Sequence, residues 1–459
     1  MADSPRVGVI GAGYVGLTTA VVLAGFGFPV VAVENNPRKL RALQAGKSPL
    51  YEPGLDDLLE EVLRNGSLHF TDRIEEALSS SDVVFIAVGT PSDSDGSADL
   101  SAVLQVSDSI AAALARRTVI VMKSTVPIGT CDVVSDRIAE GLRKRGLLRR
   151  GPAKAAEELF VVASCPEFLR EGKAVQDLVH PHRIVIGTDS ALALDLLRKL
   201  FRPIDAPILV TDRRSAEAIK YASNAFLATK ISFVNEMANV CEATGADIVS
   251  VAKGMGLDDR IGEKFLQAGV GYGGSCFPKD TRALLRIADD AGYDFAILRA
   301  VIEANERQKR RVAAILEEML GKLAGARIAL LGLAFKPETD DIRDAPSLAV
   351  AQALLEKGAT VVGCDPKAGP QFSMAIPQVV IAQSAHDALL DADACVLLTE
   401  WQAFAELDLQ AVRGWMKGDV LVDGRNIYDP AAAMRAGFRY RGIGRCAHGI
   451  QGKAKEDGR

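Results

Sequence analysis

The chain lacks any C-x-x-C pair. Its seven cysteines are odd in number and lie far apart, between Cys131 and Cys446. Neither a zinc knuckle nor a disulfide framework is indicated, because both require closely spaced or evenly paired cysteines. This usage fits a reducing compartment, so we expect a cytoplasmic protein that holds no metal.

The sequence also lacks an excess of charge and an unbroken apolar span. A formal net charge of −5 argues against a surface for nucleic acid or another polyanion. Residues 7–33 carry no charge and are long enough to cross a membrane, yet six glycines and Pro29 interrupt them. No basic stretch precedes them, because Asp3 offsets Arg6. A buried strand, a glycine turn, a helix and a second buried strand explain this stretch better than a membrane helix or a signal peptide.

What the chain does contain is an alternation of short apolar runs and helical patterns, in two separate regions. The first region predicts a helix at 15–25 and strands at 6–10, 29–34, 82–88, 118–123, 160–164 and 183–187. The second predicts a helix at 347–357 and strands at 327–332, 360–365, 394–399 and 420–423. This βαβ alternation predicts parallel sheets with helices on both faces.

A helical region separates the two. Residues 212–243 contain no Gly or Pro and have apolar residues at helical spacing, so we expect one long helix that connects two domains or packs against a partner subunit. Helical texture continues to about residue 315, interrupted by a glycine loop at 269–274. The predicted fold class is α/β, with two Rossmann-like domains joined by a central long helix. We place the domains at 1–205, 206–315 and 316–446, followed by a disordered tail at 447–459.

The first strand runs into a G-x-G-x-x-G motif and then into a helix. Gly11 would make the tight turn, Gly13 would admit a pyrophosphate, and Gly16 would let the helix pack on the strand. Glu34, at the end of the second strand, would accept hydrogen bonds from a ribose and repel a 2′-phosphate, which favours NAD over NADP. Arg38 and Lys39 lie just downstream and could soften that preference. An FAD site or a degenerate nucleotide fold remains the alternative.

Later strand ends should line the same crevice. The segments Val88-Gly89-Thr90-Pro91 and Lys123-Ser124-Thr125-Val126-Pro127 follow predicted strands. Their threonines are the better candidates for ligand contact, and their prolines indicate ordinary turns.

The loop at 273–280 sets a thiol, an amine and a carboxylate close together after two glycines. A thiol beside a cation such as Lys279 becomes a nucleophile, and the carboxylate of Asp280 could move protons. The alternative is that Cys276 is a small core residue. Glycines at 273 and 274 would let a substrate approach the backbone closely.

Two further pairs carry polar chemistry. Lys220 and Asn224 share one face of the long helix, where a partly desolvated lysine and an amide could stabilise a developing oxyanion. Glu167 and Glu171 follow the strand at 160–164 and could serve as a base and a positioning group. On spacing alone, all four could equally be surface residues.

Taken together, these stretches resemble the UDP-glucose/GDP-mannose dehydrogenase family over nearly the whole chain, from Val7 to about Asn426. The resemblance rests on segments in the family's order: the glycine motif, Tyr51-Glu52-Pro53-Gly54-Leu55, Gly89-Thr90-Pro91, Ser124-Thr125-Val126-Pro127, residues 166–172, residues 219–226, residues 273–280, and Gly332-Leu333-Ala334-Phe335-Lys336-Pro337.

The resemblance implies an NAD-dependent oxidation of a sugar-nucleotide primary alcohol to a carboxylate in two steps. Cys276 would attack the intermediate aldehyde to form a thiohemiacetal, and a second oxidation would leave a thioester for water to hydrolyse. Lys220 and Asn224 would stabilise the oxygen on C6, Asp280 would assist proton transfer, and Glu167 would act as the base in hydrolysis. Thr125 and Glu171 would support the water. Lys279 then becomes a cofactor or structural contact.

The same resemblance implies the binding residues. The cofactor set is Gly11, Gly13, Tyr14, Val15, Gly16, Glu34, Lys39, Gly89, Thr90, Ser124, Thr125, Glu171, Lys279 and Arg343. The substrate set is Glu167, Phe168, Leu169, Arg170, Lys220, Asn224, Arg260, Phe265, Leu266, Gly269, Tyr272, Gly273, Phe277, Phe335, Lys336 and Arg425. Arg260 would reach the substrate of a neighbouring subunit, so a homodimer or a larger homo-oligomer is expected.

UDP-glucose is the expected substrate, because Ser275 precedes Cys276 and residues 224–230 fit that branch of the family. The same chemistry on GDP-mannose or a UDP-N-acetylhexosamine stays open. Two other classes are a one-step hydroxy-acid dehydrogenase and a catalytically silent NAD-binding scaffold. Cys165 departs from the family, which commonly has Asn before Pro166-Glu167, and Glu34 stands where Asp is frequent.

Overall fold

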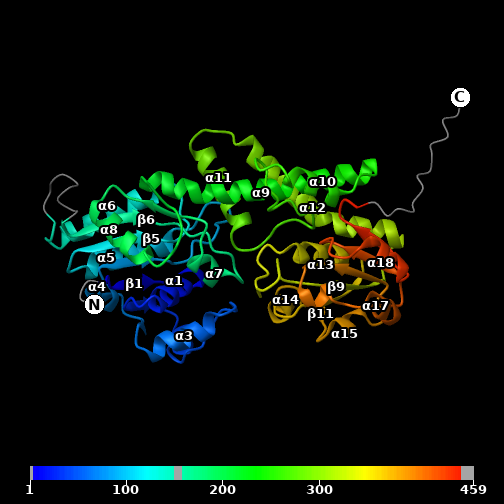
Figure 1. The fold of residues 1–459 in the computed structure, drawn as a ribbon, viewed down its shortest axis with the longest axis horizontal. Helices are drawn as coiled ribbons and strands as arrows, with labels where there is room; N and C mark the ends of the chain where they lie inside the picture. The colour runs from blue at the N-terminus through cyan, green and yellow to red at the C-terminus, as the bar shows by residue number, and fades with distance from the viewer. Residues whose placement is uncertain (1–3, 149–157, 446–459) are drawn as a thin grey trace. The chain divides into compact units, whose positions relative to one another are not determined.

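The computed structural model describes residues 4–148 and 158–445, so the tail predicted at 447–459 lies outside the described residues. The chain divides into two compact units (Figure 1). Unit 1 comprises Met1–Ser223 and Arg282–Tyr293, and unit 2 comprises Asn224–Thr281 and Asp294–Arg459. Two of the three boundaries fall within helices, α9 (Arg213–Thr244) and α11 (Phe277–Asp290), and the third lies between Tyr293 and Asp294, just after α11.

Unit 1 contains an eight-stranded sheet with the order β3-β2-β1-β4-β5-β6-β7-β8. The strands are β1 (Val7–Ile10), β2 (Val30–Val33), β3 (Leu68–Thr71), β4 (Val83–Ile86), β5 (Thr118–Met122), β6 (Phe160–Ser164), β7 (Ile184–Gly187) and β8 (Ile208–Thr211). The helices are α1 (Tyr14–Gly25), α2 (Pro37–Gln44), α3 (Leu55–Arg64), α4 (Ile74–Ser80), α5 (Ser101–Ala113), α6 (Thr130–Lys144), α7 (Ala174–Val179) and α8 (Ala191–Phe201).

The central strands of this sheet are buried on both faces, as expected for short, continuous apolar runs. Val83 and Phe85 of β4 join one core with α1, α3 and α8, whereas Val84 and Ile86 join a second core with α4, α5 and α6. Helices therefore cover both faces, which confirms the predicted doubly wound arrangement.

One part of the sheet departs from the parallel prediction. Strands β1 to β6 are parallel, but β7 pairs with β6 in the antiparallel sense through Ser164 and Gly187. The chain between β6 and β7 passes beyond the carboxyl edge of the sheet before it returns. Gly187, the last residue of β7, lies opposite Ser164, the last residue of β6, so the earlier residues of β7 lie beyond the carboxyl end of β6. The pattern did not predict β3 or β8, because His69 interrupts one apolar run and β8 is a partly exposed edge strand.

Unit 2 contains a six-stranded parallel sheet with the order β11-β10-β9-β12-β13-β14. Its strands are β9 (Arg327–Leu331), β10 (Thr360–Cys364), β11 (Val380–Ile381), β12 (Ala394–Leu397), β13 (Val420–Asp423) and β14 (Arg439–Gly442). Its other helices are α10 (Ile248–Gly256), α12 (Ala296–Leu320), α13 (Pro346–Glu356), α14 (Gly369–Ala375), α15 (Ala385–Leu389), α16 (Gln402–Ala405), α17 (Leu409–Trp415) and α18 (Pro430–Arg435).

The helices of unit 2 pack on the two faces of its sheet. Val234 of α9, Val312 of α12 and Val350 of α13 share a core with one face of β9. Ala388 of α15 and Val412 of α17 share a core with the other face. The break in the helical texture is wider than the predicted 269–274, because the whole stretch from 257 to 276 lies between α10 and α11. No helix among the residues described here has the length and apolar character to cross a membrane.

Candidate functional site

The glycine motif forms a tight turn between β1 and α1. Gly11 has φ +97°, and a Cβ there would lie 2.8 Å from the carbonyl oxygen of Ala87. A Cβ on Gly16 would lie 1.8 Å from the Gly11 oxygen, so only glycine lets the helix approach the strand. A Cβ on Gly13 would meet nothing within 4 Å, which leaves the open space that a pyrophosphate needs beside the amides of a helix N-terminus. The turn therefore fits a dinucleotide.

The acid of this motif directly follows β2. Glu34 is buried, and its Oε1 accepts a hydrogen bond of 2.8 Å from the backbone N–H of Asn36. Asn36 caps α2 by accepting from the backbone N–H groups of Arg38 and Lys39, while the Lys39 side chain is exposed. The carboxylate thus lies where a ribose would be expected in this fold.

The loops after β4 and β5 lie together, as the predicted strand ends require. Thr90 Oγ1 donates to the carbonyl oxygen of Thr125 at 2.8 Å, and Ser124 Oγ donates to the carbonyl oxygen of Val88 at 2.6 Å. Lys123 directly follows β5 and is buried, and its positive charge acts on Glu167. Sequence reasoning noted Lys123 only as a strand end.

Tyr14, predicted to contact the cofactor, makes a hydrogen bond with Glu52 through its hydroxyl. Burial, followed by the hydrogen bond to Glu52, raises the pKa of Tyr14. Glu52 also accepts the N–H groups of Gly172 at 2.6 Å and Ala174 at 2.7 Å. Glu52 therefore ties the loop that carries Glu167 and Glu171 to the dinucleotide turn. The sequence showed Glu52 only as part of a motif, because nothing local reveals what a buried carboxylate holds.

Glu167 and Lys220 form a buried ion pair of 2.7 Å, with side chains only 5% and 4% exposed. Burial alone would raise the pKa of Glu167, but the charge and hydrogen bond of Lys220 lower it below its usual value. The second carboxylate oxygen accepts the N–H of Leu169. Glu167 is therefore held as a carboxylate.

Two cations contact the ring of Phe168. The Arg183 guanidinium stacks 3.7 Å from the ring centroid, and the Lys220 ammonium lies 5.5 Å from it. Arg183 also donates to Ser223 Oγ at 3.1 Å. Arg183 was not predicted, because nothing local shows that β7 runs antiparallel to β6 and starts beyond the carboxyl end of that strand. The neighbouring Arg170 forms an ion pair with Asp177.

Cys276 differs from the other cysteines that the structure describes. The five others are buried, and burial raises the thiol pKa of four of them, for example that of Cys364 to about 11. Cys276 is partly exposed and directly precedes α11, and its Sγ lies 3.5 Å from Ser275 Oγ. The positive end of a helix dipole favours negative charge at such a position.

Asp280 lies one turn further along. It is buried, and its two oxygens accept from Asn224 Nδ2 and Lys279 Nζ, each at 2.6 Å. Unit 2 therefore brings together the thiol, the amide and the carboxylate that were predicted to act on one carbon. It also places Lys279 beside Asp280.

The glycines before Cys276 serve the chain's own packing. A Cβ on Gly273 would lie 2.4 Å from the carbonyl oxygen of Asp344, and one on Gly274 would lie 2.7 Å from the Phe335 ring. Gly274 also donates its N–H to the Arg343 carbonyl oxygen at 2.8 Å. The sequence had suggested that these glycines admit a substrate. The structure shows that their missing side chains make room for the segment after β9.

The remaining predicted substrate residues of unit 2 lie near these loops. Arg425 donates to the carbonyl oxygens of Leu398 at 2.7 Å and Phe335 at 3.2 Å. The Phe277 ring lies 6.3 Å from that of Phe265 and 6.0 Å from that of Tyr272. Arg260, predicted for the substrate, and Arg343, predicted for the cofactor, are both exposed and pair with nearby acids, Asp258 and Asp341.

The predicted site residues thus divide between the units. Unit 1 holds Gly11, Gly13, Tyr14, Val15, Gly16, Glu34, Lys39, Gly89, Thr90, Ser124, Thr125, Glu167, Phe168, Leu169, Arg170, Glu171 and Lys220. Unit 2 holds Asn224, Arg260, Phe265, Leu266, Gly269, Tyr272, Gly273, Cys276, Phe277, Lys279, Asp280, Phe335, Lys336, Arg343 and Arg425. Within the described ranges, no group of three His, Cys, Asp or Glu residues could hold a metal ion.

Comparison with known proteins identifies relatives along the whole chain. Three models of the UDP-glucose/GDP-mannose dehydrogenase family match: the NAD binding domain at residues 5–205, the central domain at 214–307 and the UDP binding domain at 329–430. The chain is 48% identical to a UDP-glucose 6-dehydrogenase of Pseudomonas aeruginosa, over 96% of this chain and 97% of that protein.

Solved structures agree with this. A UDP-glucose dehydrogenase from the archaeon Pyrobaculum islandicum superposes with a TM-score of 0.88 at 40% identity, covering 96% of this chain and 98% of that one. A UDP-D-ManNAc dehydrogenase from Pyrococcus horikoshii gives 0.83 at 30% identity, covering 96% and 100%. The match to the NAD binding domain, together with the glycine turn, establishes NAD as the cofactor.

Proposed function

Because the chain belongs to the UDP-glucose/GDP-mannose dehydrogenase family, we propose that it oxidises C6 of UDP-glucose twice to give UDP-glucuronate. The observation that carries the proposal is the position of Cys276. Among the described cysteines it alone is not buried, and it lies at the start of a helix whose first turn holds the buried Asp280. A reacting thiol needs this access and this environment.

NAD, when bound at the glycine turn, accepts a hydride in each of the two oxidations. After the first, the Cys276 sulfur bonds to the aldehyde carbon and forms a thiohemiacetal, whose carbon loses the second hydride to give a thioester. Water then adds to that carbon, the C–S bond breaks, and the thiol is restored. The covalent bond keeps one carbon in place between the two oxidations.

The buried polar groups have distinct roles in this scheme. Glu167 is held as a carboxylate by Lys220 and accepts a proton from the hydrolytic water. Lys220 stabilises the negative charge that develops on the C6 oxygen. Asn224 fixes the orientation of Asp280, which moves the proton of the reacting hydroxyl.

We also propose a homodimer that assembles through α9. Phe226, Phe233 and Val240 recur every seventh residue and are 66%, 51% and 51% exposed, so they form an apolar stripe along one side of the helix. Arg260, whose side chain is 89% exposed, would reach the partner's substrate. The double variant Phe226→Asp/Phe233→Asp should sediment as a monomer, and the exposed Glu236→Gln on the same helix should not. A wild-type monomer at micromolar concentration would contradict this proposal.

The remaining proposals concern the domain boundaries, the cellular location and the use of the product. We divide the chain into a cofactor domain at 1–205, a central helical domain at 206–315 and a UDP-sugar domain at 316–446, and the three matched family segments support this division. We place the protein in the cytoplasm, where it would supply UDP-glucuronate for polysaccharide biosynthesis.

The decisive experiment measures NADH formed per UDP-glucose consumed. The proposal predicts two NADH for each sugar and UDP-glucuronate as the product. A ratio of one would indicate a single-step dehydrogenase. GDP-mannose and UDP-N-acetylmannosamine serve as competing substrates, and turnover of either one in preference to UDP-glucose would reassign the substrate.

A further inference from the structure

Buried carboxamide side chains form hydrogen bonds with the backbone of the loop that leads to Cys276. Asn305 of α12 accepts the N–H of Tyr272 at 2.8 Å and donates to its carbonyl oxygen at 3.1 Å. Gly269 is held in the same way by two residues: its N–H donates to Asn235 Oδ1 at 2.8 Å, and its carbonyl oxygen accepts from Gln308 Nε2 at 2.7 Å. These three side chains are only 2–3% exposed.

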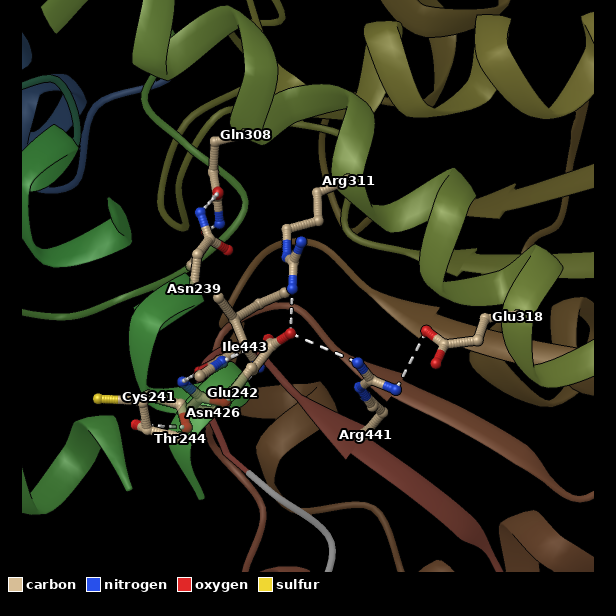
Figure 2. Close-up of polar contacts among 12 residues, drawn as sticks. Asn239, Cys241, Glu242, Thr244, Gln308, Arg311, Glu318, Asn426, Arg441 and Ile443 are labelled. Atoms are coloured by element: carbon tan, nitrogen blue, oxygen red, sulfur yellow. Dashed lines mark hydrogen bonds and ion pairs between the residues drawn. The ribbon is translucent and has the colours of Figure 1, made fainter. Parts of the chain in front are cut away.

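A fourth carboxamide nearly closes this arrangement into a ring. Asn239 Nδ2 donates to Gln308 Oε1 at 3.3 Å, as Figure 2 shows. The two atoms without a partner are Asn235 Nδ2 and Asn239 Oδ1. They are a donor and an acceptor one helical turn apart on α9, so they complement each other. We call Asn235, Asn239, Asn305 and Gln308 the amide scaffold.

Ion pairs one turn further along fix the base of the scaffold. The Glu242 side chain of α9 is only 6% exposed and pairs with Arg311 of α12 and with Arg441 of β14, and Arg441 also reaches Glu318 (Figure 2). Glu242 further accepts the N–H of Gly444 at 2.8 Å. The helices that carry the scaffold are therefore held against each other.

This arrangement specifies where the loop lies. A buried carboxamide that loses its partner costs about 1–3 kcal/mol, so the four hydrogen bonds to the loop favour the positions that Gly269 and Tyr272 occupy. Gly271, between them, has φ +101°, and a Cβ there would lie 2.8 Å from Asn305 Oδ1. On the other side, Gly274 is held by the Arg343 carbonyl oxygen. The backbone just before Cys276 is thus held on two sides.

We propose that Asn305, Gln308 and Asn235 are positioning residues for the nucleophile. Together they bind the N–H and the carbonyl oxygen of both Gly269 and Tyr272, and so fix the position of the Cys276 thiol. They are neutral, so they place the thiol without changing the charge around it. The inference rests on the proposed function of Cys276 and extends it to side chains on α9 and α12.

The test uses the full-length variants Asn305→Leu and Gln308→Met, which keep most of the side-chain volume but not the hydrogen bonds. We expect kcat for UDP-glucose oxidation to fall about a hundredfold, the cost of displacing a reacting group by roughly 1 Å. NAD affinity, measured by calorimetry, should stay unchanged. Amide hydrogen exchange at residues 269–274 should speed up, and the rate of Cys276 alkylation by iodoacetamide should change.

Matched controls separate positioning from general stability. Val312→Ala removes buried volume from the same helix without touching the loop, and Glu303→Gln changes an exposed residue two positions from Asn305. Val312→Ala should lower Tm as much as the scaffold variants and leave kcat within about twofold. An equal loss of kcat in Val312→Ala, or unchanged kcat in both scaffold variants, would overturn the inference.

Two further readouts keep the test decisive. Should Asn305→Leu fail to fold, the milder Asn239→Ala, which removes only the bond to Gln308, should still speed up loop exchange. Unchanged exchange in that variant would count against the scaffold. If the wild type fails to oxidise UDP-glucose, the proposed function is wrong, while exchange and alkylation still decide whether the scaffold positions the loop.

Discussion

In unit 1 the acid after the second strand is Glu34, and in unit 2 the acid in the same place, after β10, is Asp365. Glu34 accepts one hydrogen bond from the backbone, at Asn36. Asp365 accepts four backbone N–H groups, those of Leu333, Ala334, Lys367 and Ala368, as well as Trp401 Nε1. The first carboxylate can still accept from a ribose, whereas the second is used by its own domain.

The turns before these acids differ in the same way. In unit 1, Gly13 leaves open space, but in unit 2 the turn after β9 continues from Gly332 into Leu333 and Ala334. A Cβ on Gly332 would lie 2.4 Å from the Cβ of Thr399, so this glycine serves packing. Strands β1 to β6 of unit 1 and the six strands of unit 2 therefore share a topology, but the loops at their strand ends offer different groups to a ligand.

The sharpest way to test this division is to remove the thiol of unit 2. Cys276→Ser should lower the rate of UDP-glucuronate formation by on the order of 10⁶-fold, the loss seen when a catalytic nucleophile is removed. NAD affinity should not change, because the glycine turn lies in unit 1. Steady-state assays and NAD titration measure the two effects, and Cys364→Ser serves as a buried-cysteine control. Retained turnover would return Cys276 to a structural role.

The next largest effect concerns the turn of unit 1. Gly16→Ala places a Cβ against the Gly11 oxygen, so we expect about 1–3 kcal/mol lower stability and loss of NAD binding. Gly13→Ala has free space and should keep its stability while weakening NAD binding. Urea unfolding and calorimetry compare the two variants. Equal stability losses would mean that Gly13 is also needed for packing.

Exchanging the acids for amides tests the comparison directly. Glu34→Gln should weaken NAD binding about tenfold, since hydrogen bonds to charged groups contribute about 1.5–3 kcal/mol. Asp365→Asn should leave NAD binding unchanged and lower stability by a similar free energy, because it disturbs five hydrogen bonds. If Asp365→Asn weakened NAD binding, the two acids would not have separate roles.

The smallest effect is a difference in pH dependence between two buried carboxyls. Lys220 leaves Glu167 with a lowered pKa, so its contribution to stability is present above the unfolded pKa of about 4.3 and is lost as pH falls. Burial raises the pKa of Asp423 in unit 2, even though Tyr428 N–H and Tyr440 hydroxyl donate to it. Its contribution is present at low pH and is lost as pH rises.

Urea unfolding between pH 3 and pH 6 separates the two. The stability difference between wild type and Glu167→Gln should grow with pH, and that between wild type and Asp423→Asn should shrink. Each slope is limited to about 1.4 kcal/mol per pH unit, the value for one proton. Parallel slopes would show that Lys220 does not determine the ionisation of Glu167.

Local pattern determined much of this protein. The apolar runs specify the central strands, and three glycines specify the cofactor turn, because strand burial and backbone freedom act over a few neighbouring residues. The stretch around Cys276 places a thiol, an amine and a carboxylate within a few residues, which predicts a reactive loop. The pattern was also sufficient for the two α/β regions and the long helix that became α9.

Tertiary structure decided which side chains contact one another. Lys220 forms an ion pair with Glu167, and Arg183 stacks on Phe168. Asn305 forms hydrogen bonds with the backbone of Tyr272. The two residues of each pair are far apart in the chain, so no sequence periodicity predicts these contacts. The antiparallel direction of β7 and the five hydrogen bonds to the Asp365 carboxylate likewise depend on which segments pack together. The sequence therefore determined which chemical groups are present and which strands carry them. Only folding decided which buried charge or amide each group would face, because a buried polar side chain is satisfied by whatever the fold brings beside it.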